Sequence, residues 1–468
     1  WCGERVSQKR GMQMKSKKLL AQIAAFSLVF GMTGVVSSWA DEIILDGTTV
    51  KFPNDAISLV KNEDGSFTVN NQDVKGVWLQ NGSKLTANHV NFINGGDGFS
   101  EISVDDKSTL TVNGGSLDSG QDAFNVNDGS KAEVNEAKVT TGAWANNAAI
   151  TLKNSNTSGN WLYAGNAFPD PEKENDNGPV KEGLPVGSIT IDGGTASVKN
   201  VLVQNKGQFN VTNGAVLDVT KDTSATDSAW EQPATGIMKG GEIVVRAWGP
   251  NNEWGEKENS DTINKLDKAT SFTVNGKSTI KADAIDVTGN SYQKHTARAK
   301  LMVNASSTVT ANTMNVGKYG YTYFKDSQLT VNGKLSVSGA ADGPTNPNPV
   351  GVEMHGGSAT LNEVNVKNNG YIDLDQVNIT AKQLAMDSSC AAIKGGSFKA
   401  DALTVNGTDY EADKGDAQVL ATNSKIELNN ATFTKYGHAD VKDSQFTVNG
   451  TLKLTSDEAI PDKGVNFF

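Results

Sequence analysis

Histidine is the side chain most often used for acid–base catalysis and metal binding near neutral pH. This chain has four, His89, His295, His355 and His438. None has a second histidine, a cysteine or a carboxylate at the spacing typical of zinc sites. Two of the four, His89 and His438, lie in or beside repeated segments, at positions where other copies have Thr, Asn or Gly. We therefore predict no metal site, no cofactor and no catalytic histidine.

Nucleophilic catalysis by serine requires an activated serine in a recognisable loop. The nearest string is Leu117-Asp118-Ser119-Gly120, which lacks the glycine that a chymotrypsin-like loop places before the aspartate. The segment Gly95-Gly96-Asp97-Gly98 resembles one calcium-binding nonapeptide repeat, but a single copy does not make a site. We interpret all of these strings as chance matches and predict no catalytic residue.

Carboxylates gathered on one wall, beside a Lys or Arg base, would suit polysaccharide lyases and hydrolases built from stacked β-coils. Here Asp283 and Asp286 are close in sequence, and Arg298 follows them. However, Asp283 occupies a position that other repeats fill with Asn, so a structural role already accounts for it. A secreted polysaccharide-processing enzyme is therefore the alternative function.

Internal repeats form the framework that would position any catalytic or binding side chain. Each copy has a small polar residue, alternating apolar positions, then Asn or Asp, then further apolar positions. The copies begin at Ser83, Ser108, Ser130, Ser278, Ser307, Ser327, Ser424 and Ser444, with looser relatives at Phe209 and Ser358.

The copy at Ser83 shows how one unit would fold. Leu85 and Ala87 point to one side and Thr86 to the other, as the period-two alternation of a strand requires. We expect Asn88 to break the strand, because Asn tolerates the left-handed backbone region. The unit is then two short strands with an Asn corner, and stacked corners would form a ladder of asparagine amides.

Spacing between neighbouring copies sets the predicted architecture. It is 25 residues from Ser83 to Ser108, 22 to Ser130, and 20 from Ser424 to Ser444. One interval of this length suits one coil of a solenoid, and stacked coils bury a continuous apolar column. We predict an all-β fold, a right-handed parallel β-helix with corner-loop insertions, with about 15 coils and a length of about 70 Å.

Tandem antiparallel sandwiches are the alternative, but they favour hairpin turns every 8–12 residues or so. The β-helix predicts inward-facing apolar residues at Leu85, Val90, Leu110, Val112, Val309, Leu329, Val331, Ile426, Phe446 and Val448. It predicts outward-facing threonines at Thr86, Thr111, Thr310 and Thr330.

The N-terminal region has the three parts of a secretory signal peptide. Residues 14–40 begin with three lysines, continue with an apolar stretch from Leu19 to about Val36, and end with Ser38 and Ala40 at the −3 and −1 positions of a cleavage site. An uncleaved membrane anchor is the alternative. The ending Ser-Ser-Trp-Ala and the absence of positive charge after it favour cleavage.

Residues 1–13 start with Trp, so we interpret them as translated upstream sequence, with Met12 or Met14 as the true start.

The whole chain has a net charge of −11, and residues 1–40 hold six basic residues and one acid, so the remainder has a net charge of −16. This polyanion predicts no nucleic-acid partner. Residues 41–468 contain one cysteine, Cys390, and form the predicted solenoid domain without an internal disulfide.

Proline-rich and polar stretches interrupt the repeats. In a solenoid such insertions lie at coil corners and are natural sites for partner contacts. They are residues 166–186, 221–235, 247–262 and 340–350. The third carries Trp248 and Trp254, which would stack on a sugar ring or a partner side chain, or fold back on the coil wall.

A signal peptide followed by Gly/Asn/Thr/Ser-rich repeats of the type Ser108–Gly114 and Ser444–Gly450 resembles the passenger region of pertactin-like or AIDA-like bacterial autotransporter adhesins. The resemblance covers about residues 41–468. It implies export, translocation through a C-terminal outer-membrane barrel, and display on the cell surface or release from it. This chain lacks segments of the barrel type, so we interpret it as a truncated form.

The same resemblance implies a non-catalytic protein that binds a protein or glycan on a host or neighbouring cell. Secreted adhesins of the filamentous-haemagglutinin type are the sister possibility, since Asn346-Pro347-Asn348-Pro349 is similar to a motif of theirs. That family keeps the motif near its N-terminus, whereas here it lies far along the chain.

Overall fold

The computed structural model describes residues 42–51, 57–93, 101–118, 123–165, 185–204, 206–220, 240–246, 270–292, 295–339, 350–407 and 417–455. Strands dominate all of these ranges. The first third holds β1 (Glu42–Asp46), β2 (Thr49–Val50), β3 (Leu59–Lys61), β4 (Phe67–Asn70), β5 (Asp73–Val74), β6 (Gly76–Gln80), β7 (Lys84–Phe92), β8 (Ile102–Val104), β9 (Thr109–Leu117), β10 (Ala123–Asn127), β11 (Lys131–Asn135) and β12 (Lys138–Val139).

The middle third holds β13 (Gly142–Asn146), β14 (Ala149–Lys153), β15 (Asn156–Gly165), β16 (Ser188–Asp192), β17 (Thr195–Gln204), β18 (Gln208–Thr212), β19 (Val216–Val219), β20 (Glu242–Arg246), β21 (Thr270–Val274), β22 (Thr279–Thr288), β23 (Asn290–Tyr292) and β24 (His295–Ala297). The last third holds β25 (Ala299–Val303), β26 (Thr308–Val316), β27 (Gly320–Ser338), β28 (Gly351–Lys367), β29 (Tyr371–Asp375), β30 (Asn378–Asp387), β31 (Cys390–Asn406), β32 (Ala417–Thr434), β33 (Gly437–Lys442), β34 (Gln445–Val448) and β35 (Leu452–Thr455).

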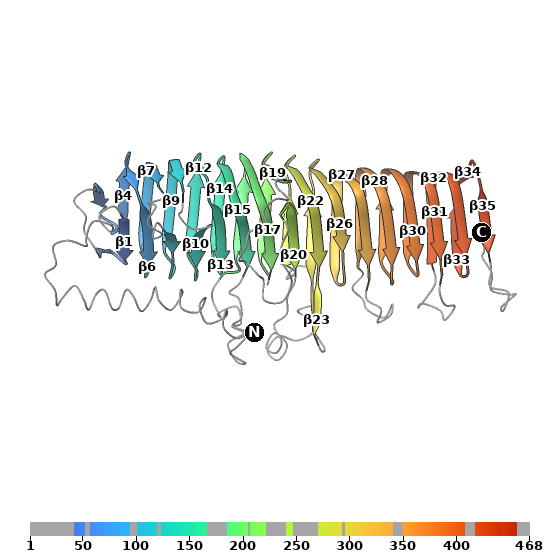
Figure 1. Ribbon diagram of the computed structural model, residues 1–468, viewed down its shortest axis with the longest axis horizontal. Helices are drawn as coiled ribbons and strands as arrows, with labels where there is room; N and C mark the ends of the chain where they lie inside the picture. Colours follow the sequence, from blue (N-terminus) through green and yellow to red (C-terminus); the bar gives the residue numbers. More distant parts are fainter. Residues whose placement is uncertain are drawn as a thin grey trace, which may run out of the picture.

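Successive coils follow one another along one rod (Figure 1), and parallel pairing assigns three strand segments, and so three faces, to each coil. We call the faces of β10, β11 and β12 face 1, face 2 and face 3. One coil later β13 pairs in parallel with β10, β14 with β11, and the start of β15 with β12. Longer strands bend around the corners, so that β27 pairs with β25 on face 2 and with β26 on faces 3 and 1. The fold is the parallel β-helix that the repeats predict, and right-handed crossovers are the usual sense for parallel strands.

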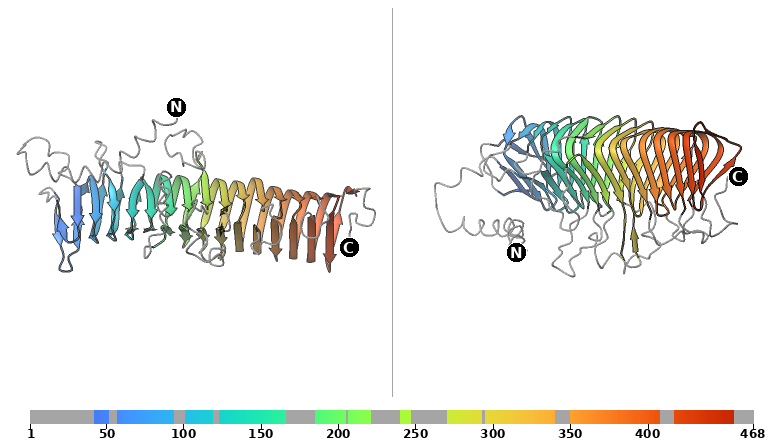
Figure 2. Two further views of the ribbon diagram at one scale, coloured as in Figure 1. Left: turned by 90° about the horizontal axis from the view of Figure 1, so that it is seen from below. Right: turned by 45° about the vertical axis from the view of Figure 1, so that its right-hand side comes forward.

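Stacked apolar side chains fill the interior from β1 to β33. The tilted view in Figure 2 shows the coils following one another along one axis. Hydrogen-bonded positions on adjacent coils are 25, 22, 20 or 18 residues apart in four examples, which agrees with the spacing of the repeats. The predicted inward positions that are buried are Leu85, Val90, Leu110, Val112, Val309, Leu329, Val331 and Ile426.

The four predicted outward threonines are half-buried rather than fully exposed. Thr86 lies in register with Thr111, and Thr310 with Thr330, so each threonine packs against the next along the wall. Two inward predictions, Phe446 and Val448 on β34, are only half-buried. The structure describes a partner strand for β34 on one side, β32, and none on the other, so these two side chains are less covered.

The repeat copies do not all stack in one column. Copies at Ser83, Ser108 and Ser130 precede strands of face 2, whereas those at Ser307 and Ser424 begin segments on face 3. Both corners use one local geometry, in which left-handed residues precede a buried serine. Examples are Asn81-Gly82 before Ser83 and Ala305-Ser306 before Ser307.

The expected asparagine ladder is present at the corner between faces 2 and 3. Asn88 donates to the Oδ1 of Asn70 at 2.8 Å, Asn113 to Asn88 at 2.9 Å, and Asn135 to Asn113 at 3.0 Å. The ladder ends where Lys153 lies in register with Asn135, whose buried Oδ1 has no partner. These asparagine side chains are therefore part of the corner structure.

One detail of this corner differs from the expectation. Asn88 stays within β7, and the residue with a positive φ is the next one, His89, at 50°. The same holds at Asn113, where Gly114 has a φ of 69°, and at Asn135, where Glu136 has a φ of 53°. The amide must lie in the strand to reach the next coil, so the left-handed turn follows it.

Replacing Asn113 by Ala removes both its donated and its accepted amide bond. We expect a loss of about 1–2 kcal/mol in the free energy of unfolding, since each net hydrogen bond contributes about 1 kcal/mol. Asn210→Ala is the matched control, because Asn210 makes a single 3.4 Å bond to Thr190. Urea unfolding of both variants measures the difference, and equal losses would contradict a stabilising role for the ladder.

Antiparallel pairing occurs in three described hairpins, β1–β2, β3–β4 and β23–β24. The last projects from the rod between β22 and β25 (Figure 1). The predicted insertions 166–186, 221–235, 247–262 and 340–350, with Trp248 and Trp254, lie wholly or mostly outside the described residues. So do residues 1–40, which include the predicted signal peptide. The described residues include no helix long and apolar enough to cross a bilayer.

Candidate functional site

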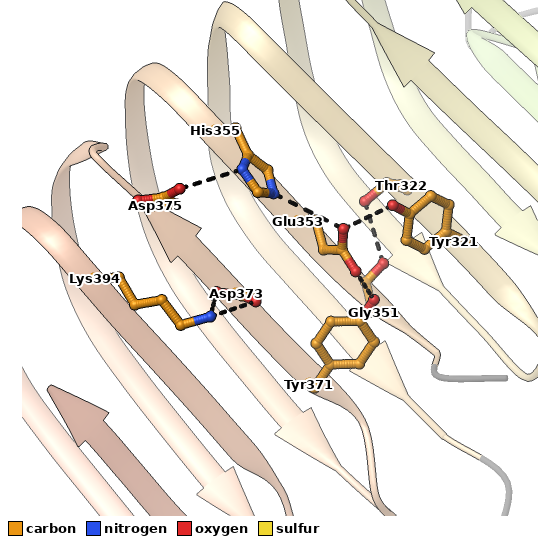
Figure 3. A network of polar contacts seen from close by, with 9 residues as sticks. All are labelled: Tyr321, Thr322, Gly351, Glu353, His355, Tyr371, Asp373, Asp375 and Lys394. Carbon is orange, nitrogen blue, oxygen red and sulfur yellow. Dashed lines mark hydrogen bonds and ion pairs between the residues drawn. The ribbon is translucent and has the colours of Figure 1, made fainter. Parts of the chain in front are cut away.

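An aromatic and acidic cluster lies on the outer surface of face 2, where β27, β28, β29 and β31 follow one another (Figure 3). Strand alternation sends Thr322, Val352 and Ile372 inward and their neighbours outward. We call the outward group the Tyr–acid cluster. Its members are Tyr321, Tyr323, Glu353, His355, Tyr371, Asp373, Asp375 and Lys394.

Glu353 is the centre of this cluster. The hydroxyl of Tyr321 donates to its Oε2 at 2.8 Å, and the hydroxyl of Tyr371 donates to its Oε1. Tyr371 reaches back because Gly351, which has no side chain, lies beneath its ring. A Cβ at Gly351 would lie 2.3 Å from Tyr371 Cε1, so a side chain at this position would displace the Tyr371 ring.

Burial raises the pKa of both Tyr321 and Tyr371 well above the usual range, and the hydrogen bond to the Glu353 carboxylate raises it further. Both phenols therefore stay protonated at physiological pH and act as hydrogen-bond donors. The result is a fixed Tyr–Glu–Tyr arrangement in which the phenols, and not solvent alone, stabilise the carboxylate.

The rim of the cluster is more exposed. Asp375 Oδ2 lies 3.5 Å from His355 Nδ1, and Glu353 Oε2 lies 4.0 Å from His355 Nε2. The Tyr323 and His355 rings are tilted at 40° with centroids 5.3 Å apart. On the next strand Lys394 Nζ contacts both oxygens of Asp373, at 3.2 and 3.1 Å. Most charged groups of the cluster are thus already paired.

Arg298 borders the cluster, with Tyr319, Tyr321 and Tyr371 around it. It is 3% exposed, and its Nε and one Nη have no hydrogen-bond partner. Burial lowers the pKa of the guanidinium, although the nearby phenols oppose this effect. Desolvation of an unpaired cation is costly, so this arginine is a local cost to the fold.

The structure separates Arg298 from the two aspartates that the sequence placed near it. Asp283 accepts from Asn312 Nδ2 at 3.0 Å at the corner between faces 3 and 1, as expected for a residue in the Asn position. Asp286 accepts from Thr288 and, at 3.3 Å, from Asn315 on face 1. In the described residues neither aspartate contacts Arg298, which lies at the start of face 2.

The histidines have different surroundings. His89 is an exposed corner residue, and His438 contacts Tyr436 O at 3.3 Å and Gln418 Oε1 at 3.2 Å. The side chain of His295 is outside the described structure, as are Ser119, Asp97 and the string Lys414-Gly415-Asp416, which resembles an integrin-binding tripeptide.

Cys390 is partly buried beside Gln418, and burial raises the pKa of its thiol. Among described residues, no group of three or more His, Cys, Asp and Glu side chains could hold a metal ion.

Sequence reasoning missed the Tyr–acid cluster, although one signal was available. The chain has eight tyrosines, and Tyr319, Tyr321, Tyr323 and Tyr371 lie in the stretch that forms three successive coils. No protein-family model, curated protein or solved structure matches this chain.

A second acidic group lies on face 1, where Glu101 and Asp105 flank β8. Burial raises the pKa of both carboxyls, and mutual repulsion raises that of Glu101 further. Asp105 accepts from Ser103 Oγ at 2.7 Å and from Asn127 Nδ2 at 2.8 Å, which opposes the shift. The folded chain thus holds Glu101 in a setting that favours its protonated form.

The raised pKa of Glu101 predicts a pH-dependent effect of Glu101→Gln. A carboxyl with a folded pKa above its unfolded value contributes stability below the unfolded pKa and loses it as pH rises through the folded pKa. The variant should therefore melt a few degrees above the parent at pH 7 and at the same temperature near pH 3. Thermal unfolding at both pH values tests this, with exposed Glu133→Gln as control. A gain that is equal at both pH values would contradict the assignment.

Proposed function

We propose that the chain is an exported, non-catalytic β-solenoid of the bacterial cell surface, of the autotransporter-passenger type, which binds a protein or glycan on a host or neighbouring cell. The observation that supports it best is the rod itself, a continuous apolar column enclosed by three polar walls. Such a rod needs no second domain to be rigid, and it presents long lateral surfaces. The signal-peptide pattern of residues 14–40 and the resemblance to autotransporter passengers agree with export.

The outward side chains along face 2 also fit a role in surface binding. Outward positions on face 2 of the first coils hold Thr, Asn, Lys and Glu, such as Thr111, Asn113 and Glu133. The Tyr–acid cluster departs from that pattern on a few adjacent coils. A local departure on an otherwise regular wall is what a binding site on a stalk would look like.

Export and display can be tested in a bacterial host that expresses the chain from Met14. The proposal expects N-terminal sequencing of the product to begin at Asp41. It also expects the product to be digested by protease added to intact cells, or to be found in the medium. A product that keeps residues 14–40 and stays protected inside the cell would contradict it.

Adhesion is tested with residues 41–468, which contain every described strand. The purified chain should bind intact host or neighbouring cells in a saturable manner and should turn over no member of a polysaccharide panel. An unrelated secreted β-protein of similar net charge is the control for nonspecific adsorption. Adsorption equal to that of the control would remove the support for adhesion.

The alternative is polysaccharide processing, and one observation favours it. Glu353, Asp373 and Asp375 lie on one face with Lys394 beside them, the kind of grouping that β-helical lyases and hydrolases use. Depolymerisation that is lost in Glu353→Gln or Asp375→Asn would establish this function. Loss in Asp283→Asn or Asp286→Asn would instead place catalysis at the corner between faces 3 and 1.

A further inference from the structure

The Tyr–acid cluster is not required by the coil architecture. Outward positions of face 2 in the first coils are filled by Thr, Asn, Lys and Glu and hold no aromatic residue, and those coils are just as well buried inside. In the cluster, by contrast, two phenols and a carboxylate are desolvated together, and Tyr321 is only 8% exposed. Such an arrangement adds little to the stability of the fold, since buried polar groups stabilise little beyond offsetting their own desolvation, and recognition of a ligand would give it a use.

Exposure divides the cluster into a fixed floor and an accessible rim. The floor is the Tyr321–Glu353–Tyr371 arrangement, in which both phenolic hydroxyls are already bonded. On the rim, the side chains of His355 and Asp375 are 39% and 42% exposed, and the half-buried Tyr323 ring leans against His355. A ligand on this surface would meet rings and hydrogen-bonding groups that are held in place before it arrives.

The charges of the cluster indicate which ligand it fits. Asp373 is paired with Lys394, and Glu353 accepts from two phenols, so neither is free to bind a strongly cationic peptide. Three carboxylates on one surface would repel a nucleic acid or an acidic polysaccharide. What remains is an aromatic surface edged by neutral and paired polar groups. This matches a ligand with apolar C–H faces and many hydroxyls.

Geometry along the rod agrees with such a ligand. Coils repeat at about 4.8 Å, which is close to the length of one pyranose ring. Successive strands β27, β28 and β29 would then offer Tyr323, His355 and Asp375 in turn to successive sugar residues. The stacked strands of face 2 form a wall along the rod, so this surface suits an extended chain lying along it.

We propose that the Tyr–acid cluster binds a neutral oligosaccharide whose sugar rings stack on Tyr323 and His355 and whose hydroxyls donate to Asp375. This proposal rests on the proposed surface-binding function and names the ligand class for it. Glu353 acts as a positioning residue, because its hydrogen bonds hold Tyr321 and Tyr371 beneath the binding surface.

The test is calorimetric titration of residues 41–468 with neutral gluco-, galacto- and N-acetylhexosamine oligosaccharides, and with uronic-acid and sialylated oligosaccharides as comparison. We expect binding of at least one neutral oligosaccharide, weakened at least tenfold by Tyr323→Ala and by Asp375→Asn. Tyr436→Ala, at another half-buried tyrosine outside the cluster, should leave affinity unchanged. Melting temperatures of all variants establish that they are folded.

Salt dependence separates the ligand classes. Affinity for a neutral sugar should change little between about 0.05 M and about 0.5 M salt, whereas a charged ligand would bind much more weakly at the higher concentration. Preference for the acidic oligosaccharides, or wild-type affinity in both Tyr323→Ala and Asp375→Asn, would overturn the inference.

The failures of the two proposals can be told apart. Saturable cell binding without binding of any neutral oligosaccharide overturns the ligand class and leaves the adhesive function standing. Absence of binding to both cells and oligosaccharides removes both. Oligosaccharide turnover that is lost in Glu353→Gln would replace binding by catalysis at the same surface.

Discussion

Replacing Val331 by Asp is expected to unfold the coils on either side of it. Val331 is 1% exposed and lies in register with Ala311 on one coil and Leu361 on the next. The substitution loses the burial of a valine, about 1.5–3 kcal/mol, and places an unpaired charge in the apolar column. We expect a total loss of at least about 4 kcal/mol, which exceeds the effect of most single substitutions.

Urea unfolding followed by circular dichroism measures this loss, and hydrogen exchange shows where it acts. In a solenoid each coil is stabilised by its neighbours, so exchange should accelerate first in β26, β27 and β28. Thr330→Asp is the matched control, because Thr330 is the preceding residue and faces outward. It should cost no more than about 1 kcal/mol. A Val331→Asp variant that unfolds like the parent would show that the inward assignment is wrong.

Gly115→Ala is expected to have the second largest effect. Gly115 has a φ of 77°, and a Cβ added there would lie 2.1 Å from the carbonyl oxygen of Val90 on the preceding coil. That oxygen belongs to the backbone of a stacked strand and cannot move without disturbing the ladder between β7 and β9. We expect a loss of about 3 kcal/mol or more, since left-handed strain and a backbone clash add together.

Gly82→Ala separates the effect of left-handed backbone strain from that of the clash with the neighbouring coil. Gly82 has a nearly equal φ of 75°, but its added Cβ would have no atom within 4 Å. This variant should lose only about 1 kcal/mol, the cost of placing a side chain in the left-handed region. Comparing the two midpoints of urea unfolding gives the contribution of close coil stacking. Equal losses in the two variants would mean that backbone conformation alone explains the glycine at 115.

The inward and outward positions could be predicted from the sequence because strand alternation is a local property. Leu110, Val112 and Thr111 follow one another with period two, and each lies on the side that this period requires. The asparagine ladder could be predicted for a similar reason, since a polar corner residue repeats at each coil. Only the exact left-handed residue was misplaced, because it is fixed by how the amide reaches the next coil.

The face on which each repeat lies could not be predicted. A serine after left-handed residues fits the corner before face 2 at Ser83 and the corner before face 3 at Ser307. The two corners have the same local chemistry, so their sequences look alike. What distinguishes them is the strand stacked above and below, and this is a property of the whole coil.

The sequence by itself determined the repeat, the strand alternation and the apolar column of this protein, because each follows from residues close together in the chain. The tertiary structure alone decided the Tyr–acid cluster. Tyr321 and Glu353 are 32 residues apart, whereas Tyr371 and Glu353 are 18 apart, since coils differ in length where insertions leave the corners. Because the coils differ in length, sequence spacing does not reveal which side chains stack on one another. The hydrogen-bonded register between strands is what brings these groups together.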